Sequence, residues 1–183
     1  MRRLFLALVL SSLPVTALAQ TPATSTAVRL LREACVETDM DRARYDEVAA
    51  RKGWTSRSYA PPADTPNDWG SLYFAGPAQI LMIGSDRVVR EGNTTYPAFR
   101  SCNVVVVNPA QDWREDLEVL ALELGFRRYD PGRRSGYARF PEGQGQEWRR
   151  RDGFISWSHD PADGILSLEI YRGLEGSSPF LLR

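Results

Sequence analysis

Hydrophobic side chains recur at helical spacing near the beginning of the chain. Segment 27–52 contains neither Gly nor Pro, and Val28, Leu31 and Cys35 follow one another at intervals of three or four residues. This periodicity predicts an amphipathic helix. The apolar stripe is interrupted around 38–42, so the segment forms either one long helix or two shorter ones.

Residues suited to helix ends mark the limits of this segment. If there are two helices, Thr38 or Asp39 is expected to cap the second one. Gly53 suits a left-handed C-cap, and Trp54 is placed to pack back onto the last helical turn. Residues 55–70 contain three prolines and are expected to form a long irregular loop.

Apolar runs then alternate with turn residues, which indicates β strands. The clearest strand is 96–107, whose consecutive valines predict burial on both faces. A second amphipathic helix follows it, with Asp112 and Glu115 as a capping pair and Gly125 at its end.

The last part of the chain has the pattern of an antiparallel meander. Strands are expected at 147–151, 154–159 and 165–171, joined by Asp-Gly turns at 152–153 and 163–164. The predicted fold class is therefore α+β: a largely antiparallel sheet with two or three helices packed on one face. Because each helix ends in Gly followed by an aromatic residue, two helix-plus-three-strand units are one possible organisation.

The first residues have the pattern of a secretory signal peptide. Arg2 and Arg3 precede the apolar run 4–10, which is too short to span a bilayer, and the small residues at 17–19 suit signal peptidase. An uncleaved anchor is the alternative. The predicted organisation is a signal peptide at 1–19, a flexible leader at 20–26 and a single α+β domain at 27–183.

Composition narrows the compartment and the partners. Loss of Arg2 and Arg3 leaves two more acidic than basic residues, so bulk charge indicates no polyanionic partner. Lys52 is the only lysine, which suggests a GC-rich bacterial genome and hence a periplasmic or secreted protein. Cys35 and Cys102 are the only cysteines, and in an oxidising compartment they are expected to form a structural disulfide.

Candidate catalytic residues are few. His159 is the only histidine, and its neighbours Ser158 and Asp160 cannot converge with it because side chains alternate along a strand. We expect His159 to be an exposed hairpin residue, and Asp160 and Asp163 to serve turns rather than a cation. No cofactor, metal site or nucleophile is predicted, which favours a protein that is not an enzyme.

Arginine is concentrated in segment 127–151, where aromatic residues are interleaved with it. Such a surface suits anionic groups, although a solvated sheet face balanced by acids elsewhere would have the same composition. The candidate binding residues are Arg149, Arg151, Arg133 and Arg134. Arg149 and Arg151 should share an exposed strand face, because Trp148 and Arg150 take the opposite one.

A cysteine in the first helix, Gly53-Trp54 at its end and Cys102 in a valine-rich strand resemble the pattern of small uncharacterised exported proteins of Gram-negative bacteria. That resemblance supplies no functional residues. The sequence therefore predicts a non-catalytic protein that binds an anionic envelope component or a partner protein. A small periplasmic hydrolase is the alternative. Nucleic acid is not expected as a partner, nor is a transmembrane segment after cleavage.

The export prediction can be tested on the mature protein. Cleavage after Ala19 should give a chain that begins at Gln20, and N-terminal sequencing of periplasmic material checks this. An intact Met1 on envelope-bound protein would contradict the prediction.

Overall fold

The fold is seen in a computed structural model, which describes residues 25–60, 68–91, 94–96, 98–109, 113–129 and 144–174. The predicted signal peptide and the candidates Asp112, Arg133 and Arg134 lie outside these ranges.

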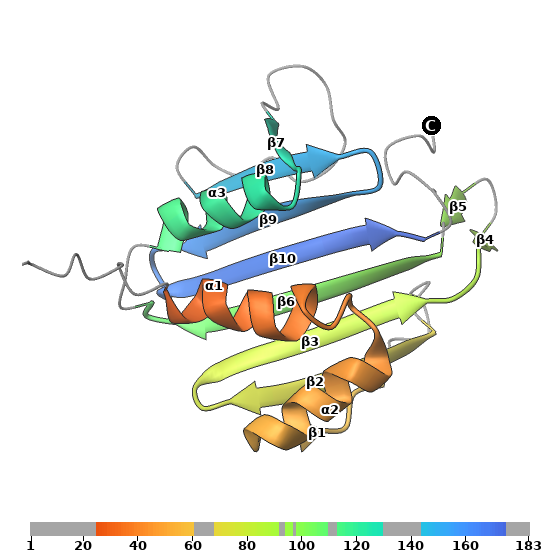
Figure 1. Ribbon diagram of the computed structural model, residues 1–183, viewed down its shortest axis with the longest axis horizontal. Helices are drawn as coiled ribbons and strands as arrows, with labels where there is room; N and C mark the ends of the chain where they lie inside the picture. Colours follow the sequence, from red (N-terminus) through yellow and green to blue (C-terminus); the bar gives the residue numbers. More distant parts are fainter. Residues whose placement is uncertain are drawn as a thin grey trace, which may run out of the picture.

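Antiparallel strands are the commonest elements of the described chain. The strands are β1 (Thr55–Arg57), β2 (Trp69–Ala75), β3 (Ala78–Ser85), β4 (Val89–Glu91), β5 (Thr94–Tyr96), β6 (Phe99–Val107), β7 (Arg127–Tyr129), β8 (Gly145–Arg150), β9 (Gly153–Asp160) and β10 (Ile165–Gly173). Within the described residues, eight of them form one sheet in the order β1-β2-β3-β6-β10-β9-β8-β7, and β4 pairs with β5 separately (Figure 1). With the helices given below, the fold is α+β, as predicted.

The first helical segment is divided. Helix α1 (Thr26–Leu31) continues into a π-helical turn, η1 (Arg32–Val36), and α2 (Arg42–Lys52) is separate. Asp39 and Met40 have φ angles of 56° and 52°, which end the first helix. Asp41 caps α2 by accepting the Arg44 N–H at 3.0 Å, so the expected cap at Thr38 or Asp39 is wrong. The Thr38 hydroxyl instead donates to the Ala34 carbonyl at 2.6 Å.

Both α2 and α3 (Trp113–Glu123) end at a left-handed glycine. Gly53 and Gly125 have φ angles of 67° and 78°, and the next residue in each case, Trp54 or Phe126, donates its N–H back to a carbonyl of the last turn at 2.9 Å. A short strand, β1 or β7, then begins at once. The expectation of an irregular loop from residue 55 is therefore wrong at its start, where β1 lies, whereas β2 begins at Trp69, near which the loop was expected to end.

The two halves of the sheet follow the same order of elements. Each half has a glycine-capped helix, a three-residue edge strand and three longer strands, and the halves meet where β6 pairs with β10. Each half thus contributes four strands to the sheet, and not three. The two Asp-Gly hairpins predicted at the end of the chain are confirmed as β8–β9 and β9–β10.

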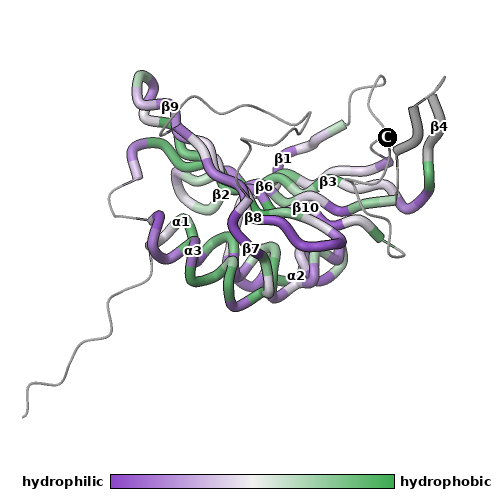
Figure 2. The backbone as a smooth tube through the Cα atoms, turned by 90° about the horizontal axis from the view of Figure 1, so that it is seen from above, coloured by the Kyte–Doolittle hydropathy of each residue, from purple (hydrophilic) through white to green (hydrophobic). Residues whose placement is uncertain are grey.

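Helices and strands both contribute to one core of buried hydrophobic side chains, and Figure 2 shows the hydropathy of each residue along the backbone. Cys35 of η1 is bonded to Cys102 of β6, as predicted. The Tyr45 hydroxyl of α2 donates to the Ile80 carbonyl of β3 at 2.8 Å, and the Trp113 and Trp157 rings of α3 and β9 meet edge to face at 4.7 Å. None of the described helices is long and apolar enough to cross a membrane.

The valine-rich strand β6 is buried less evenly than its sequence predicts. Val104 is fully buried towards the helices, Val105 is half-buried, and Val107 is 49 % exposed. Burial on both faces is therefore wrong for the end of this strand, where Val107 pairs with the exposed Ile165.

Replacing both cysteines, in Cys35→Ala with Cys102→Ala, should lower the free energy of unfolding by about 4 kcal/mol, because the disulfide closes a loop of 67 residues in the unfolded chain. Urea unfolding followed by circular dichroism measures the change. A loss well below 1 kcal/mol would contradict the assignment of the bond as a main stabilising constraint.

Candidate functional site

Three arginines from distant parts of the chain lie in one line across the sheet. Arg100 of β6 pairs with Arg172 of β10, Arg172 pairs with Gly153 of β9, and Gly153 pairs with Arg150 of β8. We call Arg100, Arg172 and Arg150 the arginine row. With strands about 4.8 Å apart, the row spans roughly 14 Å. It lies on the same face as Cys102, since alternate residues of a strand share a face.

Arg100 is held in place by the protein itself. Its Nη1 group donates to the carbonyls of Phe99 at 3.1 Å and Ser85 at 3.4 Å. Its guanidinium lies 5.0 Å from the centre of the Trp69 ring. That ring packs so closely over Gly84 that a Cβ atom there would lie 2.6 Å from it. Gly84 thus allows the aromatic platform against which Arg100 is oriented.

The other two arginines are anchored in a similar way. Arg172 forms an ion pair with Asp39 and donates to its backbone carbonyl at 3.0 Å. Arg150 binds both oxygens of Asp152, at 2.6 and 2.8 Å, and the Leu124 carbonyl at 2.8 Å. Its guanidinium lies 4.6 Å from the Phe126 ring centre. The hydrogen bonds from Arg150 lower the pKa of the Asp152 carboxyl group.

Each arginine of the row has a carboxylate partner, so the row is neutral overall. In two of these ion pairs the carboxylate is much more exposed than the arginine. Arg100 is 18 % exposed while its partner Asp86 is 63 % exposed, and Arg172 is 27 % exposed while Asp39 is 61 % exposed. Ion pairs with an exposed member contribute little free energy. Another anion can therefore replace Asp86 or Asp39 at a small cost while the guanidinium stays in position.

A cavity of about 200 Å³ opens at one end of the row. Arg150 and Arg172 line it together with Cys35 of the disulfide and Phe126. Asp39, the partner of Arg172, also lines it, so the cavity combines two arginines and a carboxylate with an apolar wall.

The sequence-based candidates are not brought together in this way. Arg149 faces the opposite side of the sheet, where it pairs with Glu147 and lies 3.4 Å from the Tyr129 ring centre. Its side chain is only 16 % exposed, so the predicted exposure of Arg149 is wrong. The cause is β7, whose Tyr129 pairs with Glu147 of β8. Arg151 is exposed, as predicted, but it lies in the β8–β9 turn and not on a strand face shared with Arg149.

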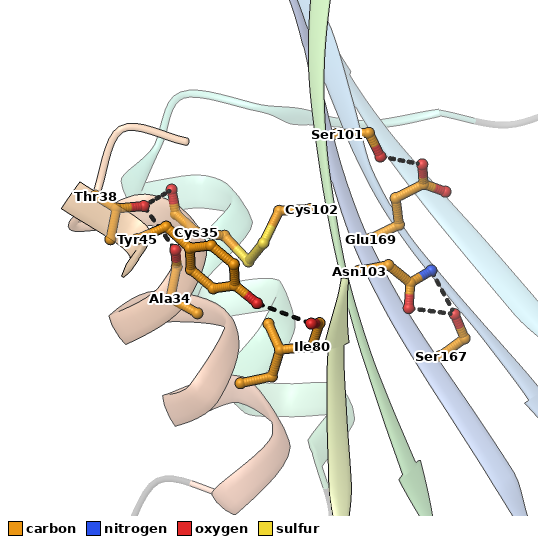
Figure 3. The surroundings of a disulfide bond; sticks show 10 residues. All are labelled: Ala34, Cys35, Thr38, Tyr45, Ile80, Ser101, Cys102, Asn103, Ser167 and Glu169. Carbon is orange, nitrogen blue, oxygen red and sulfur yellow. Dashed lines mark hydrogen bonds between the residues drawn. A yellow bond between two sulfur atoms is a disulfide. The ribbon is translucent and has the colours of Figure 1, made fainter. Parts of the chain in front are cut away.

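The face away from the disulfide carries a polar cluster at the centre of the sheet (Figure 3). The Ser101 hydroxyl donates to Glu169 at 2.8 Å, and the Asn103 amide donates to Ser167 at 3.0 Å. Each serine is the third residue of its strand, and Asn103 and Glu169 are the fifth. The two hydrogen bonds thus repeat each other across the β6–β10 pair. Burial raises the pKa of Glu169.

Residues considered for catalysis do not converge. His159 is partly buried, with its ring centre 6.3 Å from that of Trp113, and so is less exposed than expected. Ser158 pairs with Ser167 on the other face. Asp160 accepts the Ala162 N–H at 2.9 Å, which is a turn contact. No group of three or more potential metal ligands occurs among the described residues.

Sequence reasoning missed all three residues of the arginine row: it placed Arg150 on the face opposite to its candidates, and it did not consider Arg100 and Arg172. Both lie outside the arginine-rich segment 127–151. Only the strand register places them beside Arg150, so a correct prediction would have needed the pairing of β6 with β10.

Comparison with known proteins adds no family: no family model, curated protein or solved structure matches the chain.

The carboxyl group of Glu169 should make stability depend on pH. Because its pKa is raised in the folded protein, its favourable contribution is fully present below the unfolded pKa, about 4.3, and is lost as pH rises through the folded pKa. Glu169→Gln should therefore be more stable than the parent at pH 8 and equally stable at pH 4. Urea unfolding at both pH values tests this, and an equal difference at both would contradict it.

Proposed function

We propose that this protein is a non-catalytic binding protein of the cell envelope, periplasmic or secreted, whose arginine row binds the anionic groups of an envelope component. The observation that carries the proposal is the alignment of Arg100, Arg172 and Arg150. Their guanidinium groups are fixed by backbone carbonyls, while two of their three carboxylate partners are largely exposed. Fixed guanidinium groups suit phosphate and carboxylate ligands because little side-chain entropy is lost on binding.

The proposed compartment rests on the signal-peptide pattern of the first nineteen residues. The Cys35–Cys102 disulfide is compatible with it, because such bonds persist in oxidising surroundings. We also infer that the helices form a layer on a single face of the sheet. The row would then lie at the edge of that layer, next to the turn between η1 and α2, from which Asp39 reaches Arg172.

The residues proposed from sequence have different places in this proposal. Arg151 follows Arg150 in the exposed turn and extends the positive surface. Arg133 and Arg134 remain proposed contributors outside the described residues. Arg149 is on the face opposite to the arginine row. It could bind the same ligand only through a second contact on that face.

One observation favours the alternative, a small periplasmic hydrolase. Glu169 and Glu147 both pair with Ser156, so the three side chains share one line on the face away from the disulfide. Two carboxylates with different environments can divide acid and base roles. If this alternative holds, Glu169→Gln should abolish a hydrolytic activity, whereas changes to the arginine row should leave it intact.

The binding proposal predicts that Arg100→Gln with Arg172→Gln weakens sedimentation with phosphatidylglycerol vesicles at low salt. The expected loss is roughly fivefold in affinity for each arginine, from about 1 kcal/mol per basic residue near an anionic surface. Arg57→Gln, an exposed change on the edge strand β1, removes one positive charge away from the row; it is the control for each single variant, Arg100→Gln and Arg172→Gln, and should bind like the parent.

Neutral vesicles should retain neither protein. Equal binding of the parent and the double variant would contradict the role of the row, as would a parent that does not bind at low salt. Retention on polyglutamate but not on vesicles would instead favour an acidic partner protein.

A further inference from the structure

We propose that the cavity beside the disulfide binds the carboxylate end of a small apolar acid, and that Asp39 occupies the position of that carboxylate in the free protein. The inference rests on the proposed function, because it assigns one end of the arginine row a defined ligand class.

The lining of the cavity combines charge with apolar surface. Arg150 and Arg172 provide the positive charge. The Asp39 carboxylate is also part of the lining, and the apolar part includes Val36, Met40, Leu124, Phe126 and Ile170. At about 200 Å³ the cavity is smaller than small-molecule sites, which occupy roughly 300–1,000 Å³. It therefore suits one end of a ligand, with an alkyl or aryl group against the apolar wall and an anion at the arginines.

Both guanidinium groups have the capacity for a further acceptor. A guanidinium carries five N–H donors. The contacts described for Arg172 use two of them, on the carboxylate and the carbonyl of Asp39. Those described for Arg150 use three, on Asp152 and Leu124. Gly153, which pairs with both arginines, places no side chain between them in the strand register.

The group bound to Arg172 in the free protein indicates the chemistry of the ligand. Arg172 holds a carboxylate, that of Asp39, which is 61 % exposed and reaches the arginine from the rim of the cavity. Asp39 and its neighbour Met40 both adopt left-handed φ angles, 56° and 52°, and such an angle is unfavourable for a long side chain such as that of Met40. Such local strain is typical of ligand-binding sites. A ligand carboxylate that displaces Asp39 from Arg172 would allow this turn to relax.

Two substitutions should then have opposite effects. Asp39→Asn removes the competing charge, and Asn tolerates the left-handed conformation, so the variant should bind octanoate up to about fivefold more tightly than the parent, as expected for loss of an exposed ion pair. Arg172→Gln should bind octanoate more weakly than the parent. Asp163→Asn changes the net charge equally at the exposed hairpin on the opposite end of the sheet, and should bind like the parent.

The measurement is a titration of the mature protein with octanoate, followed by the amide resonances around Met40, Phe126 and Arg172. Octanol and inorganic phosphate are titrated separately. We expect octanoate to bind more tightly than either, since octanol lacks the charge and phosphate lacks the apolar group. If Arg172→Gln does not fold, the comparison of Asp39→Asn with Asp163→Asn still tests whether the ligand displaces Asp39.

Several results would overturn the proposal. Asp39→Asn that binds no better than Asp163→Asn would exclude the displacement of Asp39, and octanol that binds as well as octanoate would exclude recognition of the carboxylate. Vesicle binding without octanoate binding would overturn the cavity assignment and leave the proposed function standing. Octanoate binding in the cavity without vesicle binding would instead contradict the proposed binding of envelope anions by the row. It would support the ligand class proposed for the cavity.

Discussion

The antiparallel pairing of β6 with β10 is the contact on which the rest of the structure depends. It runs from Phe99 and Gly173 at one end to Val107 and Ile165 at the other, and it joins two half-sheets that have no other strand pairing between them in the described chain. Its register is fixed from the helix side, because a shift of one residue would turn Cys102 away from Cys35 and expose Val104 and Leu168. The disulfide and the buried aliphatic side chains therefore specify the same alignment.

This one register arranges both faces of the sheet. Towards the helices it sets Arg100 beside Arg172, and the β9 and β8 strands add Gly153 and Arg150 to the same line. On the other face it sets Ser101 and Ser167 within hydrogen-bond distance of Glu169 and Asn103. The arginine row and the polar cluster thus depend on the same backbone alignment, and a change that disturbs β10 should affect both.

The sequence predicted those features that depend on local chemistry. Asp-Gly turns, glycine caps and amphipathic periodicity located the hairpins, the ends of α2 and α3 and the general fold class. The strands β1 and β7 were not predicted from sequence, because three residues are too few to show a periodicity. Strand β7 in turn determines the environment of Arg149. The arginine row was also out of reach, since Arg100 and Arg172 become neighbours only through pairing between the two halves of the chain. The cysteine pair was the exception among long-range contacts, because only one pairing was possible.

The central claim is that strand register builds an anion-binding row at one end of the sheet. It is tested most directly by mapping amide chemical-shift changes of the mature protein in phosphatidylglycerol bicelles. The account predicts the largest changes at Asp39, Arg100, Arg151 and Arg172, which lie at or beside the row. Changes centred instead on the opposite end, around Asp160 and Ile165, or on Tyr129 and Arg149 of the other face, would contradict it.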